Sequence, residues 1–257
     1  MKTISILLFS LLTGNLLFAQ HTKIVTAGSI EYEKSVNTYA INREIIAGYP
    51  PQMQTMISRS FDDYQRRMPQ FAKLNSKLIF NSNKTLFTPI EANSGHPVSY
   101  LQATTACNQI NTVYTDLATG TRVVQKQVFE NQYLLTDSLS KIKWRLVDET
   151  QDIAGYTCRR ANGVIQDSVY VVAFFTDKIW VSGGPESFSG LPGMILKLAL
   201  PHEHITWTAT KVTEEAPAVA IEPPKKGKPT TNAQLKTLLN SRGKGTMVLY
   251  EKKLFLL

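Results

Sequence analysis

The sequence has little of the chemistry on which most enzymes and metal proteins depend. Its 257 residues include only two cysteines and four histidines. It contains no nucleophile elbow, no phosphate-binding glycine loop and no carboxylate pair of the glycosidase type, and it has no internal repeat. These absences favour a non-catalytic protein, and we expect no cofactor.

Long apolar runs are also lacking after the N-terminus. The chain opens with one cation, Lys2, followed by an interrupted apolar run over residues 4–18 and then Ala19. This layout is typical of a secretory signal peptide, and the run is short for a bilayer span of about 20 residues. We predict a signal peptide over residues 1–19, cleaved near Ala19. Residues 20–257 would then form a single β-rich domain, periplasmic or secreted.

Acidic residues are in the minority, so the formal net charge is +8. Part of the excess lies in a cluster at Lys225, Lys226 and Lys228. A basic surface attracts nucleic acid or anionic membranes, but an exported protein rarely meets nucleic acid. We therefore predict no nucleic-acid partner and interpret residues 214–230, which are rich in proline and lysine, as a solvated surface linker.

The two cysteines, Cys107 and Cys158, leave two alternatives open. Export places them where disulfides persist, and one bridge would close a loop of about 50 residues, worth about 4 kcal/mol in the chain-entropy model. Two buried free thiols are the other alternative.

Hydrophobic alternation with a period of two predicts most of the fold. Segments with this pattern or with a short apolar run are 29–41, 77–80, 84–88, 141–147, 153–160, 168–176, 194–200, 205–209 and 246–257. Asn81 and Asn83 suit a hairpin turn between two of them. In the segment from Lys141 to Val147, the apolar face would meet the core.

Two segments have helical patterns. Met53, Ile57, Phe61, Tyr64 and Met68 form one apolar stripe of an amphipathic helix. A capping box over residues 231–234 predicts a second, short helix that ends near residue 243. Together these patterns predict a β-dominated α+β fold with one early amphipathic helix and one short late helix. A curved antiparallel sheet that wraps the early helix would bury both apolar faces.

Glycine and proline are concentrated in residues 183–193. Pro192 and Gly193 suit the two central positions of a type II turn. The segment Gly190-Leu191-Pro192-Gly193-Met194-Ile195-Leu196, preceded by Gly184-Pro185 and Phe188, resembles the signature of the GLPGLI family, apart from Met194 where the family has leucine. We interpret these motif residues as structural.

Upstream segments share this resemblance, which covers about residues 28–212. They are Gly28–Tyr32, Trp144 with Glu149, and Ile153–Cys158 followed by Ala161. The resemblance implies an exported protein of Gram-negative bacteria, from a family without an established function. By fold-level analogy alone, its strands are similar to the half-barrel of periplasmic lipoprotein carriers, which covers a hydrophobic cavity.

Three functional hypotheses follow. The first is a non-catalytic cell-envelope protein that binds a hydrophobic ligand or assists an outer-membrane transport component. Its cavity would be lined by the early helix and by Met194, Leu196 and Leu198. The second is a periplasmic metal-binding protein, because His202 and His204 on a strand would lie on one face about 7 Å apart. The third is an unrecognised enzyme, with a polar cleft beside Glu186, Ser187 and Ser189.

Overall fold

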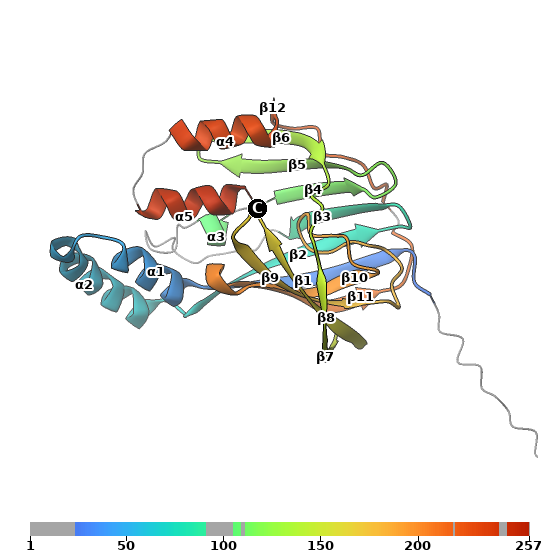
Figure 1. Cartoon of the computed structure of the whole chain (residues 1–257), viewed down its shortest axis with the longest axis horizontal. Helices are drawn as coiled ribbons and strands as arrows, with labels where there is room; N and C mark the ends of the chain where they lie inside the picture. The colour runs from blue at the N-terminus through green and yellow to red at the C-terminus, as the bar shows by residue number, and fades with distance from the viewer. Residues whose placement is uncertain (1–23, 91–104, 109–110, 218, 242–245, 257) are drawn as a thin grey trace, which may run out of the picture.

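A computed structural model describes residues 24–90, 105–108, 111–217, 219–241 and 246–256 (Figure 1). The expected signal peptide, with its cleavage point near Ala19, lies outside these ranges. Within them, no helix is long and apolar enough to cross a membrane.

The described residues form one twelve-stranded sheet. Its strands are β1 (Gly28–Asn37), β2 (Phe71–Phe80), β3 (Lys84–Ile90), β4 (Asn111–Asp116), β5 (Thr121–Val128), β6 (Asn131–Ser138), β7 (Arg145–Ile153), β8 (Tyr156–Ile165), β9 (Val169–Thr176), β10 (Met194–Leu200), β11 (Ile205–Thr213) and β12 (Lys228–Thr230). Their order is β12-β6-β5-β4-β3-β2-β1-β11-β10-β9-β8-β7, antiparallel throughout except for the parallel pair β12–β6. The β-dominated α+β class is confirmed. The sheet is open, with β12 and β7 at its edges, so the topology does not support the half-barrel analogy.

Five α-helices accompany the sheet in the described ranges. They are α1 (Thr38–Ala47), α2 (Pro51–Arg67), α3 (Thr105–Asn108), α4 (Asn232–Ser241) and α5 (Thr246–Phe255), with a 3-10 turn over Pro201–Glu203. The start of α1 explains why the first strand is shorter than predicted. The Asn37 side chain accepts a hydrogen bond from the Ala40 N–H, which caps a new helix where strand alternation had been expected to continue.

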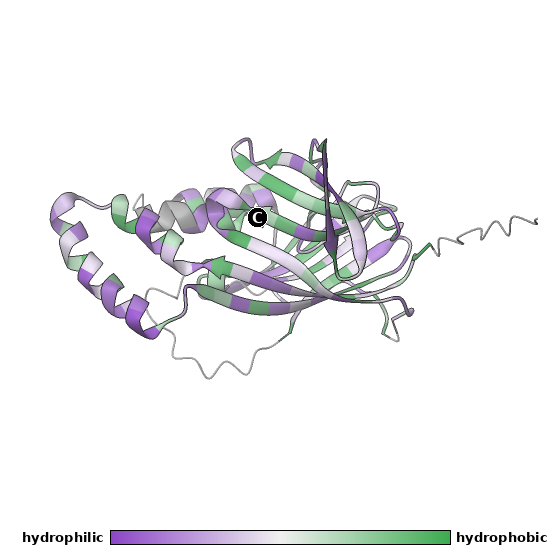
Figure 2. Cartoon of the chain, turned by 90° about the horizontal axis from the view of Figure 1, so that it is seen from below, coloured by the Kyte–Doolittle hydropathy of each residue, from purple (hydrophilic) through white to green (hydrophobic). Residues whose placement is uncertain are grey.

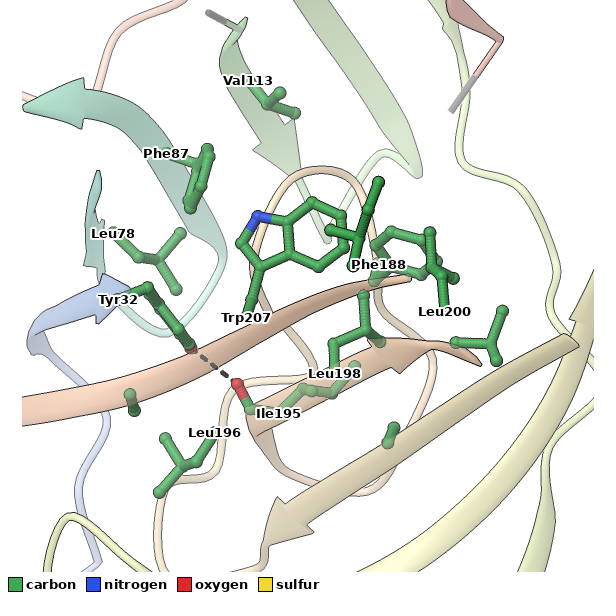
Figure 3. Close-up of a cluster of buried hydrophobic side chains, with 14 of the residues drawn as sticks. Tyr32, Leu78, Phe87, Val113, Phe188, Ile195, Leu196, Leu198, Leu200 and Trp207 are labelled. Atoms are coloured by element: carbon green, nitrogen blue, oxygen red, sulfur yellow. Dashed lines mark hydrogen bonds between the residues drawn. The ribbon is translucent and has the colours of Figure 1, made fainter. Parts of the chain in front are cut away.

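The main core lies against the central strands. Alternating residues of β1 are buried, and Leu196, Leu198 and Leu200 of β10 are fully buried. Figure 3 shows Leu198 and Leu200 near Trp207 and Phe188, while the Tyr32 hydroxyl donates to the Ile195 carbonyl over 2.6 Å. The predicted alternation of buried and less buried residues is therefore confirmed in β1 and β10, each of which has a strand on both sides.

The early helix forms as its stripe predicts, but it does not pack under the sheet. Phe61 and Tyr64 of α2 bury themselves against Ile46 of α1 in a separate small cluster, and Met53 stays 42% exposed. Figure 1 shows the two helices projecting beyond the strand ends, and Figure 2 shows mostly hydrophilic residues along α2. The expectation that the sheet wraps this helix is wrong. The apolar stripe of α2 is narrow, and its buried residues pack against α1 instead of the sheet.

The late helices cover the core instead. Leu235 and Leu239 of α4 and Leu254 and Phe255 of α5 are buried in the main cluster. The prediction of a C-terminal strand over residues 246–257 is wrong. Leu254 and Phe255 are neighbours in sequence, and a helix can bury both against the core, whereas successive residues of a strand point to opposite faces.

Turn and cap chemistry is found where the sequence predicted it. The Asn81 side chain accepts from the backbone N–H groups of Asn83 and Lys84, closing the β2–β3 hairpin. At α4, Gln234 N–H donates to the Thr231 hydroxyl, and Thr231 N–H donates to the Gln234 side chain. Both donors are thereby satisfied at the start of the helix.

Residues 214–230 differ from a freely solvated linker. Ile221 is 9% exposed and packs with Ile79 and Tyr114 on the sheet. Residues 228–230 then add β12 to the edge of β6. The segment is thus attached to the sheet at two points.

Candidate functional site

The glycine-rich loop between β9 and β10 is held by close backbone packing. A Cβ atom on Gly193 would lie 2.0 Å from the Thr176 carbonyl oxygen, and φ at this glycine is +148°. Gly193 N–H donates to the Leu191 carbonyl over 2.8 Å, which closes a three-residue turn around Pro192. The predicted type II turn is therefore wrong. The loop approaches β9 so closely that only glycine fits, and this contact sets the turn.

Side chains of the same loop point inward. Phe188 is 4% exposed and Leu191 is 2% exposed, and the Phe188 ring lies 6.3 Å from the Trp207 ring. The Trp144 indole N–H donates to the Ser189 carbonyl, and the Ser182 hydroxyl accepts from Gly190 N–H. These contacts hold the loop in place against its neighbours.

A cavity of about 810 Å³ opens next to this loop. Its lining comes from the end of the β8–β9 hairpin, the segment before β7, β5, the glycine-rich loop and Leu256, which follows α5. The lining residues are Arg122, Ser140, Lys141, Ile142, Lys143, Arg145, Asn162, Gly163, Val164, Ile165, Gln166, Asp167, Tyr170, Ser187, Phe188 and Leu256. The volume suits a small organic molecule.

The segment before β7 is positioned by a glycine on the neighbouring strand. The side chains of Ile142 and Trp144 lie over Gly163, where any Cβ would approach within 2.9 Å of Ile142. The strand itself begins only at Arg145, and Leu146 is 47% exposed. The strand predicted over residues 141–147 is therefore wrong in its first half, and Leu146 does not face the core, whereas Ile142 and Trp144 pack against the main core as predicted. Packing on Gly163 holds the first half of this segment as a cavity wall instead.

Arg122 is the most unusual residue of this cavity. Its side chain enters from β5, is 8% exposed and donates from Nη1 to the Ser187 hydroxyl over 2.9 Å. Burial lowers the pKa of the Arg122 guanidinium, and the nearby charge of Asp137 partly offsets this effect. Among the described residues, no carboxylate forms an ion pair with it.

The charge of the cavity is strongly one-sided. Lys141, Lys143 and Arg145 add three exposed cations to Arg122, whereas Asp167 is the one carboxylate among the described lining residues. A buried cation with spare N–H donors, behind a rim of further cations, is the arrangement expected of an anion-binding site.

A second polar cluster lies on the inner side of the same loop. The Glu186 carboxylate accepts from the Asn111 amide over 3.0 Å and is close to the ammonium groups of Lys34 and Lys126. Lys34 also lies 5.2 Å from the centre of the Trp207 ring, and Lys126 donates to the Phe255 carbonyl of α5. This cluster therefore ties the loop, the sheet and α5 together.

The inner cluster shifts the pKa values of its members. Burial raises the pKa of Glu186, while Lys34, Asn111 and Lys126 oppose the rise. Burial also lowers the pKa of Lys34, and it lowers the pKa of Lys126 to about 8. Burial dominates each shift because these groups have exchanged water for apolar neighbours.

Sequence reasoning missed the three buried cations of these two clusters, although a signal was present. Lys34 occupies an inward step of the alternation in β1, between Tyr32 and Val36. Arg122 and Lys126 occupy inward steps in β5, which alternates in the same way. A cation at an inward position is rare without a function or a partner, so this pattern could have identified them.

The predicted cleft beside the three loop side chains is only partly present. Ser187 lines the basic cavity, but Glu186 points to the inner cluster, and Ser189 is 7% exposed. The described contact of the Ser187 hydroxyl is with the Arg122 donor, and no described residue contacts it as a general base. This geometry lacks the base that would activate a serine nucleophile.

The predicted histidine metal pair is wrong. Residues 201–203 form a 3-10 turn, and His204 adopts left-handed backbone geometry instead of continuing a strand. His204 Nε2 lies 2.8 Å from the Glu44 carboxylate of α1, while the His202 ring packs 6.4 Å from the Tyr170 ring of β9. Glu203, between them, is buried and pairs with Lys253 of α5. The described residues contain no group of three metal-ligating side chains.

The disulfide alternative is not found in the structure. Cys107 and Cys158 are both buried, and they are not bonded to one another. Cys107 belongs to α3, which packs against β2 and α5, whereas Cys158 lies on β8 between β7 and β9. Burial raises the pKa of Cys158 to about 12, so its thiol stays protonated.

The expected hydrophobic cavity is also not found. Met194, Leu196 and Leu198 have no exposed surface and line neither of the two cavities that the structure describes. The second of these is small, about 10 Å³, and lies beside Lys34, Glu186 and Trp207. The strand that was expected to line a ligand cavity belongs to solid core.

Comparison with known families gives one partial match. Residues 162–197 match the model of a family described as a protein of unknown function (Porph_ging). The match runs from the end of β8 through β9 and the glycine-rich loop into β10, which is far less than half of the chain. A search among curated proteins finds no match.

Solved structures show likeness in fold. Two crystal forms of PNGF-II each align with a TM-score of 0.51 at 15% identity, over 83% and 87% of this chain. This chain spans only 33% of the length of PNGF-II in both cases. An uncharacterized conserved protein from Thermus thermophilus aligns with a TM-score of 0.38 at 6% identity, over 81% of this chain and 92% of its own.

Proposed function

We propose that this protein is an exported, non-catalytic protein of the cell envelope that binds a small anionic molecule in the basic cavity. The observation that carries the proposal is Arg122, a buried guanidinium that faces the cavity without an ion-pair partner among the described residues. Burying a charge is unfavourable unless a partner compensates it. The charge of Asp137 offsets part of this cost, and a bound anion would supply a partner in direct contact.

The exposed cations at the rim support the same function. Lys141, Lys143 and Arg145 line the cavity, are exposed to solvent and raise the local concentration of anions by long-range attraction. Arg122 would make the short, directional contact, because a guanidinium can donate two parallel hydrogen bonds to a carboxylate or a phosphate. The rim would thus affect the rate of capture, and Arg122 the lifetime of the complex.

Three parts of this proposal are supported by the sequence: export, family membership and the partner. The signal-peptide pattern supports a periplasmic or secreted location. The glycine-rich loop and its upstream segments support membership of the GLPGLI family, and the match over residues 162–197 includes that loop. An outer-membrane transport component is the proposed recipient of the bound molecule.

Calorimetric titration of the exported protein with inorganic phosphate, citrate and phenyl phosphate tests the function. At low salt we expect saturable binding of at least one probe with a Kd below about 1 mM, weakened by added salt. Arg122→Gln should weaken this binding by about tenfold or more, since it removes a charge-assisted contact.

The matched control is Arg159→Gln, because Arg159 is an exposed cation of β8 that does not line the cavity. Its Kd should stay within about twofold of the wild-type value. The proposal fails if none of the three probes saturates the protein, or if Arg122→Gln binds them as tightly as the wild type does.

A further inference from the structure

We infer that the anion has an apolar body attached to its acid group, so that the ligand is a small amphiphile. This inference rests on the proposed function, because it assumes that the acid group contacts Arg122. It concerns the part of the cavity between Arg122 and the β8–β9 hairpin. The lining there combines apolar side chains with the polar Asn162 and Gln166 of the hairpin, while the exposed cations come from the segment before β7 and its first residue.

The apolar wall can be followed from strand to strand. Ile142 lies against Gly163 of β8, and Ile165, two residues further on, faces the same side of that strand. Phe188 follows Ser187, the residue that accepts the hydrogen bond from Arg122, and Leu256 completes the lining. The cavity that Arg122 enters is therefore lined in part by aliphatic and aromatic side chains.

The size of the cavity points to the same class of ligand. An inorganic anion would occupy a small part of 810 Å³ and would leave the wall in contact with water. An apolar body would remove this surface from water and gain about 0.8 kcal/mol per buried methylene. It would also lower the local dielectric constant, which strengthens the contact between the acid group and Arg122.

The test compares hexyl phosphate with inorganic phosphate and with neutral hexyl glucoside, by titration calorimetry of the exported protein. We expect hexyl phosphate to bind at least about tenfold more tightly than inorganic phosphate, the gain for burying about two methylenes. Hexyl glucoside should bind more weakly than hexyl phosphate by at least a similar factor, because it lacks the acid group.

Two variants test whether the gain in affinity of hexyl phosphate over inorganic phosphate comes from the apolar wall of the cavity. Ile142→Ser should remove most of the advantage of hexyl phosphate over inorganic phosphate. Leu146→Ser is the matched control, because Leu146 is an exposed aliphatic residue of β7 outside the cavity, and this variant should keep the advantage. Unfolding curves for both variants establish that they are folded.

The outcomes separate the inference from the function on which it rests. Equal affinity for hexyl phosphate and inorganic phosphate, both dependent on Arg122, overturns the amphiphile and leaves anion binding intact. Equal affinity for hexyl phosphate and hexyl glucoside, unaffected by Arg122→Gln, overturns both proposals.

The same chemistry occurs in free amphiphiles and in membrane lipids. Co-sedimentation with phosphatidylglycerol vesicles distinguishes these sources. Capture by vesicles that depends on Arg122 and Ile142 identifies a lipid as the source. Binding of hexyl phosphate without vesicle capture identifies a free molecule.

Discussion

The two sides of the glycine-rich loop differ in how their charges are compensated. On the inner side, Glu186 lies near two buried lysines and accepts a hydrogen bond from Asn111. On the outer side, Arg122 has Ser187 as its described partner and no described ion pair. Residues 186 and 187 are neighbours in sequence, yet they serve clusters of opposite character. The comparison teaches that burial of charge alone does not mark a binding site, whereas a buried cation that lines open space, with no described ion-pair contact and only the charge of Asp137 to offset its burial, does.

The inner cluster also has a structural consequence. Lys126 holds the last turn of α5 through the Phe255 carbonyl, and Glu203 holds Lys253 of the same helix. These contacts place Leu256 in the wall of the outer cavity. The inner cluster therefore helps to build the wall of the cavity that Arg122 faces.

Removing the inner carboxylate should have the largest effect on stability. Glu186→Ala leaves two buried ammonium groups without their acid, and we expect a loss of about 3–5 kcal/mol in the free energy of unfolding, measured in urea. Glu186→Gln keeps the shape and should lose less. Arg122→Gln is the counterpart on the outer side and should cost less than about 1 kcal/mol, since no described ion pair is broken. Equal losses for Glu186→Ala and Arg122→Gln would contradict the comparison.

A substitution in the glycine-rich loop between the two clusters should have the next largest effect on stability. Gly193→Ala would press a methyl group against the Thr176 carbonyl, and we expect a loss of roughly 3 kcal/mol in the free energy of unfolding. Gly190→Ala is the control, because φ is +96° there but the nearest atom would be 3.5 Å away. It should cost only about 1–2 kcal/mol of backbone strain. Similar losses at both glycines would show that contact with β9 is unimportant.

The smallest expected effect is a dependence on pH. Burial lowers the pKa of Lys126 from its ordinary value of 10.5 to about 8, with Glu186 opposing and Arg122 reinforcing the shift. Between these values the unfolded chain keeps a proton that the native protein has released, so the contribution of Lys126 to stability rises with pH. Below pH 8 the protonated lysine imposes its full penalty.

Comparison with Lys126→Met isolates this effect, because other titrating groups cancel in the difference. From pH 7.5 to 9, the free energy of unfolding of the wild type should rise by about 1 kcal/mol relative to the variant. Urea titrations at several pH values provide the measurement. A constant or falling difference would mean that Lys126 is not a desolvated cation in the native protein.

Local patterns predicted much of the fold. The alternation in β1 and β10, the asparagine turn at Asn81 and the capping box at Thr231 all depend on neighbours in sequence, and each is found. The C-terminal segment was misassigned because a short apolar run suits a strand or a helix equally well. Its helical form depends on packing against the core and on contacts with β5 and the turn before β11.

The candidate site was less accessible to prediction. Its main residue lies on β5, its hydrogen-bond partner lies in the loop before β10, and its rim lies before β7. These segments are far apart in the chain, so no pattern of neighbouring residues indicates that they meet. The predicted histidine metal pair is wrong for a related reason: His202 and His204 are close in sequence, but His204 contacts α1 and the His202 ring packs against β9.

The sequence by itself determined the periodic strands, the caps and a loop whose glycines allow close backbone approach. Those features follow from steric preferences and hydrogen bonds between residues that are near one another in the chain. Only the tertiary structure decided which cations meet a carboxylate and which face an open cavity. Compensation of charge depends on distances between strands that are far apart in sequence, and those distances are set when the sheet and its helices pack around the core.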